Sequence, residues 1–273
     1  MRSLAGRIVK GAAGAWDVVR RPSAGVVVLL YHRVGGGTGA SVDLDAGLFS
    51  AQLEMLVETV ARVTLDETIK RVSRVTSSPE APESAVAVTF DDGTADFAEH
   101  AVPLLVAHQV PATIYVATDF VEAGRPFPDG LPAVSWAALR DAVATGFVTV
   151  GSHTHTHRLL DRAEPDVIID ELDRSRELIE ERLGVPARHF AYPKARPGSA
   201  VADAAVRERF ASAALAGTRA NAYGATDPYQ LARSPVQTSD GLRWFARKLR
   251  GGMALEDNLR QIIDRRRYAN EIT

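Results

Sequence analysis

Short apolar runs alternate with helical patterns along most of this chain, and this alternation limits the folds open to it more than any other feature. Seven runs read as buried strands: Gly25 to His32, Ala85 to Phe90, Ala112 to Ala117, Phe147 to Gly151, His189 to Tyr192, Ala211 to Ala216 and Leu231 to Val236. Helical patterns lie between most of them, at Leu48 to Val63, Thr94 to His108, Ser135 to Thr145, Pro165 to Leu183 and Ala200 to Phe210, and two more follow the last run. Such alternation predicts parallel strands covered by helices, in an open sheet or a closed barrel.

Composition narrows the class of protein further. The 273 residues are 46% hydrophobic and 24% charged, which is ordinary for one globular domain. A formal net charge of -2 gives no reason to expect a nucleic-acid partner. The chain has no cysteine, which excludes disulfides, thiolate metal ligands and a cysteine nucleophile.

The two ends of the chain differ from the middle. Residues 1–24 form a basic segment with apolar residues at helical spacing, at Leu4, Ile8, Ala12, Trp16 and Val19. That segment fits a helix lying on an anionic membrane surface, and it fits equally a helix that covers one end of the domain. No signal peptide or membrane span is evident, so we expect a cytoplasmic protein, or one peripheral at the membrane, rather than a secreted one. Residues 25–250 would form the domain, and residues 251–273 a helical tail.

Polar clusters stand where the predicted strands end. His32 ends the first run, Asp91 and Asp92 the second, the segment 153–157 follows the fourth, and the segment 192–194 ends the fifth. In parallel barrels the loops after the strands build one mouth, so these groups are expected to meet there. Their convergence is the main reason to predict a catalytic site.

The residue types in these clusters are those of a hydrolytic metal centre. A carboxylate and two imidazoles can hold a divalent ion with a position open for water, while a second carboxylate takes the proton of that water. Taken alone, Asp91-Asp92-Gly93 would be a turn, and the histidines of His153-Thr154-His155-Thr156-His157 a solvated loop. Both together favour catalysis.

The same residues resemble a known family, the polysaccharide deacetylases of the NodB-homology or carbohydrate esterase family 4 type. Thr89 to Gly93 is similar to the first motif of that family, and His153 to His157 to its His-Ser/Thr-x-x-His motif. Phe190 to Pro193 is similar to the third motif. The resemblance runs from about Val27 to Arg250 and implies a distorted (β/α)7 barrel of the NodB type.

The resemblance also implies roles for single residues. Asp92, His153 and His157 would bind the metal, with zinc as the best candidate and cobalt, nickel, manganese or iron as others. Asp91 would be the general base. A backbone N–H near Lys194, with Tyr192 beside it, would stabilise an oxyanion.

The sequence departs from the commonest family pattern at two places. No histidine follows His189, so the general acid would be His32, in a Tyr-His-x-Val segment that resembles the branch acting on poly-β-1,6-N-acetylglucosamine and other exopolysaccharides. Ala191 stands where many relatives have an arginine that pairs with the base, and Arg233 is a candidate replacement. Trp136 is expected to pack over the barrel mouth, where its edge could also contact sugar.

The residues predict a metal-dependent hydrolase. The resemblance implies that it acts on carbon–nitrogen bonds other than peptide bonds and removes N-acetyl groups from hexosamines of a polysaccharide or its precursor. An N-acetylated glycan would be its partner. Two alternatives stay open at this point: an esterase or amidase on a small acylated substrate, and a noncatalytic glycan-binding module.

Overall fold

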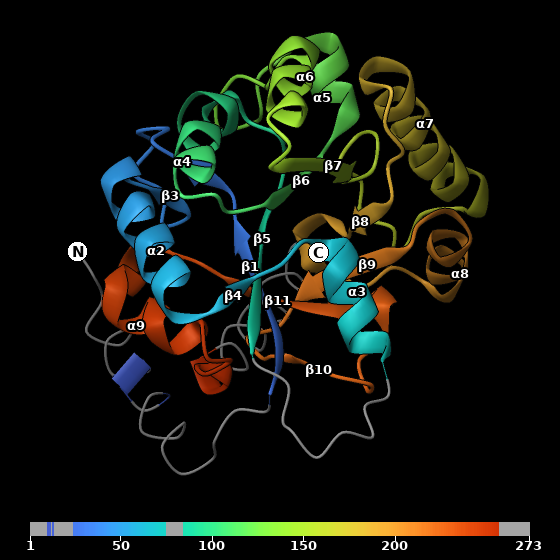
Figure 1. The fold of residues 1–273 in the computed structure, drawn as a ribbon. Helices are drawn as coiled ribbons and strands as arrows, with labels where there is room; N and C mark the ends of the chain where they lie inside the picture. The colour runs from blue at the N-terminus through green and yellow to red at the C-terminus, as the bar shows by residue number, and fades with distance from the viewer. Residues whose placement is uncertain (1–9, 12, 14–23, 75–83, 257–273) are drawn as a thin grey trace, which may run out of the picture.

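Seven parallel strands close into a barrel (Figure 1). The structure is a computed structural model and describes residues 10, 11, 13, 24–74 and 84–256. The barrel strands are β1 (Gly25–Tyr31), β5 (Ala85–Phe90), β6 (Ala112–Val116), β7 (Val148–Ser152), β8 (His189–Ala191), β9 (Ser212–Ala216) and β11 (Leu231–Pro235). They follow the order β1-β11-β9-β8-β7-β6-β5, and β5 pairs with β1 to complete the ring. All seven predicted strands and the predicted (β/α)7 barrel are confirmed.

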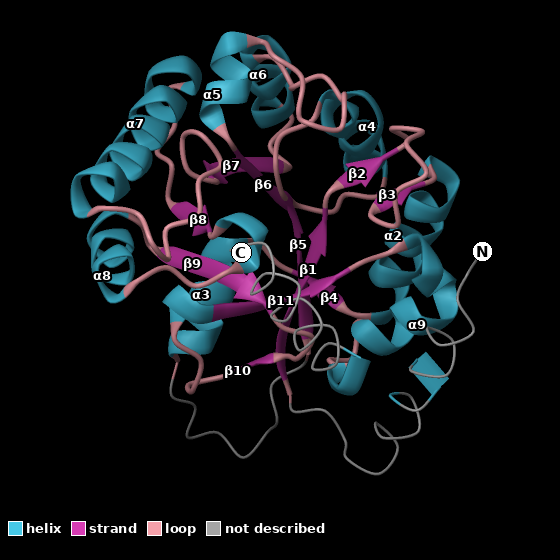
Figure 2. Cartoon of the chain, turned by 180° about the vertical axis from the view of Figure 1, so that it is seen from behind, coloured by secondary structure: helices cyan, strands magenta, loops and turns pink. Residues whose placement is uncertain are grey.

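Helices surround the strands, and one of them lies across an end of the barrel (Figure 2). They are α2 (Ala46–Thr59), α3 (Leu65–Ser73), α4 (Val102–Ala107), α5 (Thr118–Ala123), α6 (Trp136–Ala144), α7 (Pro165–Leu183), α8 (Ala200–Arg209) and α9 (Gly241–Lys248). The longest is α7, where Pro165 occupies the first turn and Gly184 ends the helix with φ 69°. Single helical turns lie at Pro193–Ala195, Pro228–Gln230 and Thr238–Asp240.

Two predicted helices differ from the observed ones. The helix expected from Leu48 to Val63 ends at Thr59, because the chain then extends into a short strand, β4 (Ala61–Arg62), that pairs with β5. The helix expected from Thr94 to His108 begins as a π-helix, η1 (Phe97–Ala101), before α4. Helices α3 and α5 were not predicted. Of the two helices expected after the last strand, α9 is one, and the other falls largely beyond residue 256, outside the described residues.

Three further short strands lie outside the ring. Strand β10 (Asn221–Ala222) pairs antiparallel with the start of β1. Strands β2 (Arg33–Val34) and β3 (Asp43–Leu44) form a separate parallel pair just after β1. Their pairing fixes the path of the chain where it leaves the barrel beside His32.

The barrel interior is narrow and is filled by alternating residues of the strands. Small side chains line much of it, and α3 closes the end where the strands begin. The interior cluster contains Val26, Val28, Ala85, Ala87, Tyr115, Ala191, Ala214 and Leu231, with Val63, Leu65 and Val72 at the closed end. The intervening residues of the same strands pack outward against the helices, as Val27 and Val86 do.

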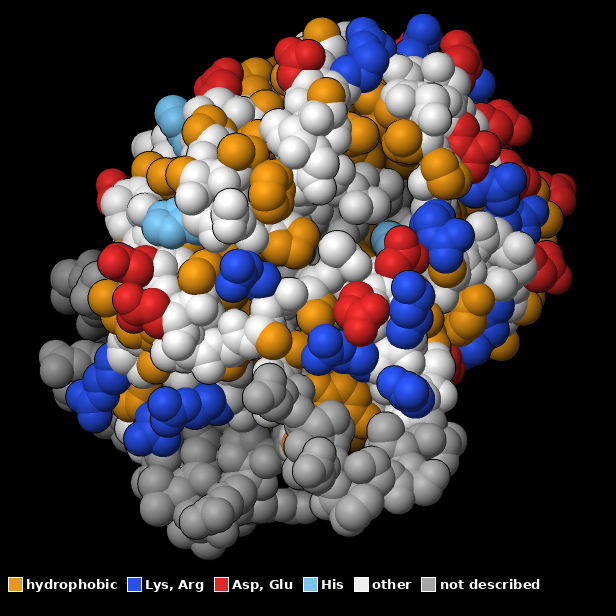
Figure 3. Space-filling model, viewed as in Figure 1, with side chains coloured by type: hydrophobic (Ala, Val, Ile, Leu, Met, Phe, Trp, Pro, Cys, Tyr) orange, Lys and Arg blue, Asp and Glu red, His pale blue; other side chains and the backbone are white. Residues whose placement is uncertain are grey.

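Charged side chains tie the outer helices together. Over α7 and α8, the face in Figure 3 carries interspersed acidic and basic side chains. Arg209 of α8 donates two hydrogen bonds to Asp173 of α7, at 2.6 and 3.0 Å. On the same helix, Arg207 binds Asp227 at 2.6 Å. Partly exposed pairs of this kind add little stability each.

Of the predicted basic N-terminal segment, the structure describes residues 10, 11, 13 and 24, and the rest lies outside the described residues. Lys10 is buried and its ammonium group contacts Asp240, so this basic residue faces the domain. The tail predicted at residues 251–273 lies mostly outside the described part as well. Within the described residues, no helix is long and apolar enough to span a membrane. The segment boundaries and a membrane contact therefore stay predictions.

Candidate active site

Acidic, imidazole and guanidinium groups meet where the barrel strands end. Asp91 and Asp92 follow β5, and His153 follows β7. Asp91 continues the two-residue alternation that turns Ala85 and Ala87 into the barrel, so its side chain enters the same interior. The predicted convergence of distant segments is thus present for this group of residues.

Arg233 of β11 holds Asp91 by both oxygens. Its Nη1 donates to Oδ1 at 2.5 Å and its Nη2 to Oδ2 at 2.8 Å, and both side chains are buried. Burial alone would raise the pKa of Asp91, but the charge and hydrogen bonds of Arg233, together with the charges of His153 and His32, lower that pKa below its usual value. Asp91 is therefore an ionised carboxylate in a fixed orientation, and the pairing expected for Arg233 is the one that the structure has.

Asp92 turns away from its neighbour toward the histidines. Its φ of 72° lies in the left-handed region, which directs its side chain differently from that of Asp91. Its Oδ1 lies 3.4 Å from Nε2 of His157 and 3.8 Å from Nε2 of His153. Burial would raise the pKa of Asp92, but the hydrogen bond from His157 and the charges of nearby histidines hold it well below its usual value.

Asp92, His153 and His157 fit a divalent cation. One ligand atom from each lies within 4.8 Å of the others. His153 Nδ1 donates to the backbone oxygen of Ala191 at 2.8 Å, which leaves Nε2 with its lone pair toward the site. Burial lowers the pKa of His153 to about 4, so the ring is neutral near pH 7, the form that binds metals. Two imidazoles and a carboxylate are the donor set of an open metal site with three protein ligands.

His155 is left out of this group. Its Nδ1 pairs with the hydroxyl of Thr118 at 2.9 Å, and its Nε2 lies 4.0 Å from Asp119 on α5. The segment 153–157 therefore sends its first and last histidines to the cation site and the middle one to a neighbouring helix.

His32 stands close enough to both aspartates for its charge to lower their pKa values. Its Nδ1 is buried, and no hydrogen bond to it occurs within residues 24–74 and 84–256. A buried ring nitrogen without a partner costs free energy unless a substrate or water meets it. His32 is thus placed beside the predicted base, and its role as acid stays a prediction.

The remaining predicted residues lie in different surroundings. Lys194 and Ala195 both have positive φ, 53° and 51°, in a tight turn after β8. Tyr192 packs edge-on against Phe190 with ring centroids 4.9 Å apart, in the layer between barrel and helices. Burial raises its pKa. Contacts of Lys194 and Tyr192 with substrate stay predictions.

Trp136 begins α6 and packs against the outer core. Its indole N–H donates to Glu122 of α5 at 2.8 Å, and Arg182 of α7 binds the same carboxylate. The ring therefore joins three helices, and its contact with sugar stays a prediction.

Sequence reasoning missed two buried polar residues near the site. Tyr115 lies beneath Arg233, whose guanidinium carbon is 5.2 Å from the ring centroid. Glu171 of α7 is 4% exposed and contacts the loop that carries the histidines. The inward alternation of β6 could have indicated Tyr115, and a glutamate on the apolar face of α7 could have indicated Glu171.

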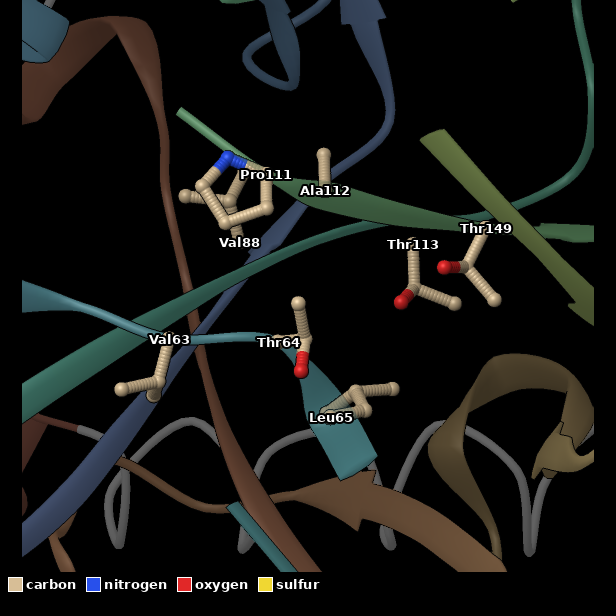
Figure 4. Close-up of a pocket in the computed structure, with 8 residues that line it drawn as sticks. All are labelled: Val63, Thr64, Leu65, Val88, Pro111, Ala112, Thr113 and Thr149. Carbon is tan, nitrogen blue, oxygen red and sulfur yellow. The ribbon is translucent and has the colours of Figure 1, made fainter. Parts of the chain in front are cut away.

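A small hollow lies elsewhere, near the starts of β6 and β7 (Figure 4). It is lined by Val63, Thr64, Leu65, Val88, Pro111, Ala112, Thr113 and Thr149. None of the aspartates, histidines or Arg233 borders it, so it is not part of the candidate active site.

Comparison with known proteins relates the central part of this chain to a family. Residues 78–211 match the polysaccharide deacetylase family, a segment that runs from before β5 to the end of α8. It contains both aspartates and the three histidines of the loop. His32 and Arg233 lie outside it, so their assignment depends on the three-dimensional arrangement.

Similar proteins include a poly-beta-1,6-N-acetyl-D-glucosamine N-deacetylase of Staphylococcus aureus, 28% identical over 120 residues. That match covers 41% of this chain and 41% of the relative, so it spans well under half of either protein. An uncharacterized protein, YlxY, of Bacillus subtilis is 25% identical over 132 residues, covering 48% of this chain and 37% of YlxY.

Among solved structures, IcaB from Ammonifex degensii is 26% identical, with a TM-score of 0.73 over 84% of this chain and 98% of that one. The deacetylase PplD of Streptococcus pyogenes has a TM-score of 0.71 at 20% identity, over 83% of this chain and 99% of PplD. The second likeness speaks for the fold alone.

Proposed function

We propose, from the premise that this chain carries a polysaccharide deacetylase domain, that it hydrolyses N-acetyl groups of a β-1,6-linked N-acetylglucosamine polymer or a similar glycan. The observation that carries the proposal is the buried, ionised Asp91 held by Arg233 immediately beside Asp92, His153 and His157. A fixed carboxylate next to a cation site can act as the general base in hydrolysis, whereas glycan binding alone does not require such a group. The substrate class is supported by the name of the similar Staphylococcus protein, a poly-beta-1,6-N-acetyl-D-glucosamine N-deacetylase.

The three-residue site would hold one divalent ion, zinc being best suited to its donor set. When bound, the ion supplies Lewis acidity that polarises the acetamide carbonyl and acidifies water. The protein residues do the rest of the chemistry. Asp91 accepts a proton from the attacking water, and Arg233 keeps that carboxylate ionised and oriented.

The bond changes follow from these positions. The water oxygen adds to the acetamide carbon, and the carbon–nitrogen bond then breaks to give acetate and the hexosamine amine. His32, whose charge acts on both aspartates, donates the proton that the departing nitrogen requires. The backbone N–H at Lys194 would donate to the oxygen that becomes negative during attack.

Acetate release from N-acetylglucosamine oligomers tests the proposal. We expect zinc-loaded protein to release acetate, and dialysis against a chelator to abolish the release. Asp91→Asn should lower kcat by about 10²–10⁴-fold, because it removes the base, and it should still bind one zinc ion per chain. His32→Ala should lower kcat by a similar factor. Glu99→Gln, on the exposed side of η1, serves as the control with unchanged rate.

Other outcomes would point elsewhere. Zinc bound at the three residues without acetate release from any glycan oligomer would favour a small-acyl esterase or amidase, which acyl-ester substrates would then detect. Failure to bind zinc, cobalt or nickel would favour a glycan-binding module. Equal rates for Asp91→Asn and the unaltered protein would refute the assignment of the base.

A further inference from the structure

The loop that carries the two histidine ligands has an unusual backbone. Thr154 has φ 64° and His157 has φ 62°, both in the left-handed region that residues other than glycine rarely adopt. Two such residues within one short loop are strained unless surrounding contacts hold them. The cation site therefore depends on groups that keep this loop in place.

Glu171 of α7 supplies the most direct of these contacts. Its Oε2 accepts a hydrogen bond from the backbone N–H of Thr156 at 2.8 Å, and its Oε1 accepts one from the Thr156 hydroxyl at 2.5 Å. Its backbone oxygen accepts a third from the N–H of His155 at 3.1 Å. One residue on a long helix thus binds the two residues that separate His153-Thr154 from His157.

A second contact lies one turn further along α7. The hydroxyl of Ser175 pairs with that of Ser152 at 2.6 Å, and Ser152 accepts from the N–H of Thr154 at 3.2 Å. Both serines and Glu171 are buried. Helix α7 therefore holds the loop at its start and at its middle. The helix itself is anchored in the core through the buried residues Ile168 and Leu172.

We propose that Glu171 is a positioning residue for the cation site: it fixes Thr156 so that His157 lies opposite Asp92 and His153. The inference rests on the proposed function, since it requires that those three residues bind a cation. The hydrogen bonds of Glu171 to this loop go to Thr156 and to the backbone of His155, so it acts on the cation site through the loop between the two histidines. Partners that orient ligands in this way typically change metal affinity by about 10–100-fold when they are removed.

A purely structural role for Glu171 would give different results. Buried hydrogen bonds that a loop donates to a carboxylate also stabilise the folded chain, and their loss would lower the melting temperature of the metal-free protein. A positioning role requires more: weaker binding and an altered ligand geometry at temperatures where the protein stays folded. Metal affinity and the absorption spectrum of bound Co²⁺ measure these directly, without any enzymatic assay.

The test compares Glu171→Ala, Glu171→Gln and Glu177→Ala as metal-free proteins titrated with Zn²⁺ and Co²⁺ against a competing chelator. Glu177 lies further along α7 with its side chain 66% exposed, so it is the matched control. We expect Glu171→Ala to bind both ions about 10–100-fold more weakly and to change the visible spectrum of Co²⁺. Glu171→Gln should retain most of the affinity, because an amide oxygen can still accept from Thr156 N–H.

The outcomes separate the two proposals. If the unaltered protein binds neither ion, the proposed function fails and the role of Glu171 falls with it. If the unaltered protein binds tightly and Glu171→Ala binds equally tightly with the same spectrum, the positioning role is overturned while the metal site stands. Thr156→Val keeps the backbone N–H and loses the hydroxyl, so its metal affinity should lie between those of Glu171→Ala and the control. An affinity equal to that of the control would assign the effect to the hydrogen bond from the backbone N–H alone.

Discussion

Arg233 and Asp91 form a buried, bidentate ion pair, and the two residues are 142 positions apart in the chain. The barrel interior around them is lined by small residues such as Ala191 and Ala214, which leaves room for an arginine side chain. Arg233 also donates from Nε to the backbone oxygen of Leu215 at 3.3 Å. Its planar group is thus held on two sides, which a lysine could not reproduce.

At this scale we predict that Arg233→Lys lowers kcat more than it changes KM, because Asp91 loses its fixed orientation while the binding of the glycan is unaffected. Arg233→Met should also leave Asp91 unpaired and destabilise the protein by about 3–5 kcal/mol. Steady-state kinetics and urea unfolding measure the two effects. Arg243→Lys, on the exposed face of α9, is the control. Full activity in Arg233→Lys would contradict the orienting role.

At the scale of elements, strands β7 and β8 approach each other closely at Gly151. A methyl group placed there would lie 2.6 Å from the backbone oxygen of His189 and 2.8 Å from the ring of Tyr115. Neither neighbour can give way easily, since one is a strand backbone and the other fills the barrel interior. Glycine is therefore required where β7 turns toward His153.

We expect Gly151→Ala to destabilise the protein by about 1–3 kcal/mol through overpacking. Because β7 leads directly into His153, the displaced strand should also weaken zinc binding. Thermal unfolding of the metal-free protein and zinc titration would record both changes. Thr149→Ala, on the same strand and without added volume, should bind zinc normally. A Gly151→Ala protein as stable as its parent would show that the strands can separate without cost.

At the scale of the whole molecule, a buried charge cluster joins the two ends of the described chain. Asp240 contacts the ammonium groups of Lys10 and Lys248, and Lys248 also donates to the backbone oxygen of Pro235 at 2.6 Å. Burial would raise the pKa of Asp240, but the two lysines lower it below its usual value. This cluster anchors α9 and residue 10 against the barrel.

The lowered pKa of Asp240 gives a pH dependence with a definite sign. Its ionised form is favoured by folding, so its contribution is complete above the usual aspartate pKa of about 4 and is lost as pH falls below that value. Asp240→Asn should cost about 3 kcal/mol at pH 7, because two buried lysines lose their partner. Urea unfolding from pH 7 to pH 3 should show that the difference in unfolding free energy between the unaltered protein and Asp240→Asn becomes smaller below about pH 4. A difference that stayed constant with pH would exclude ionised Asp240 as its source.

Metal removal should also lower the stability of the whole folded protein. A cation held between β5, which precedes Asp92, and β7, which precedes His153, binds the folded state only. Zinc at a hundred times its dissociation constant would stabilise folding by about 2.7 kcal/mol. Calorimetry should therefore give a lower Tm after chelation, and Asp92→Ala should abolish that difference. Identical Tm values for the zinc-loaded and chelated parent protein would speak against a cation at these residues.

Local patterns in the amino-acid sequence were enough to predict the seven strands, most of the helices and the residues that follow each strand. These depend on patterns within a few residues: apolar runs, helical spacing, and Asp91-Asp92 or His153 to His157 at the end of a run. The break of the predicted helix after Thr59 was missed, because Ala61 and Arg62 become a strand only through pairing with β5. The π-helical turn at Phe97–Ala101 likewise has no local signal.

The tertiary structure alone decided how these pieces meet. Closure of the ring requires β1 to pair with β5 from Val26 to Tyr31, a register that no short pattern encodes. That closure and the small interior side chains set Arg233 against Asp91 and Tyr115 beneath it. The hydrogen bonds from the loop to Glu171 depend in the same way on α7 folding back along β7. Local sequence determines which functional side chains stand at each strand end. The distances between those side chains are set only by the long-range packing that closes the barrel.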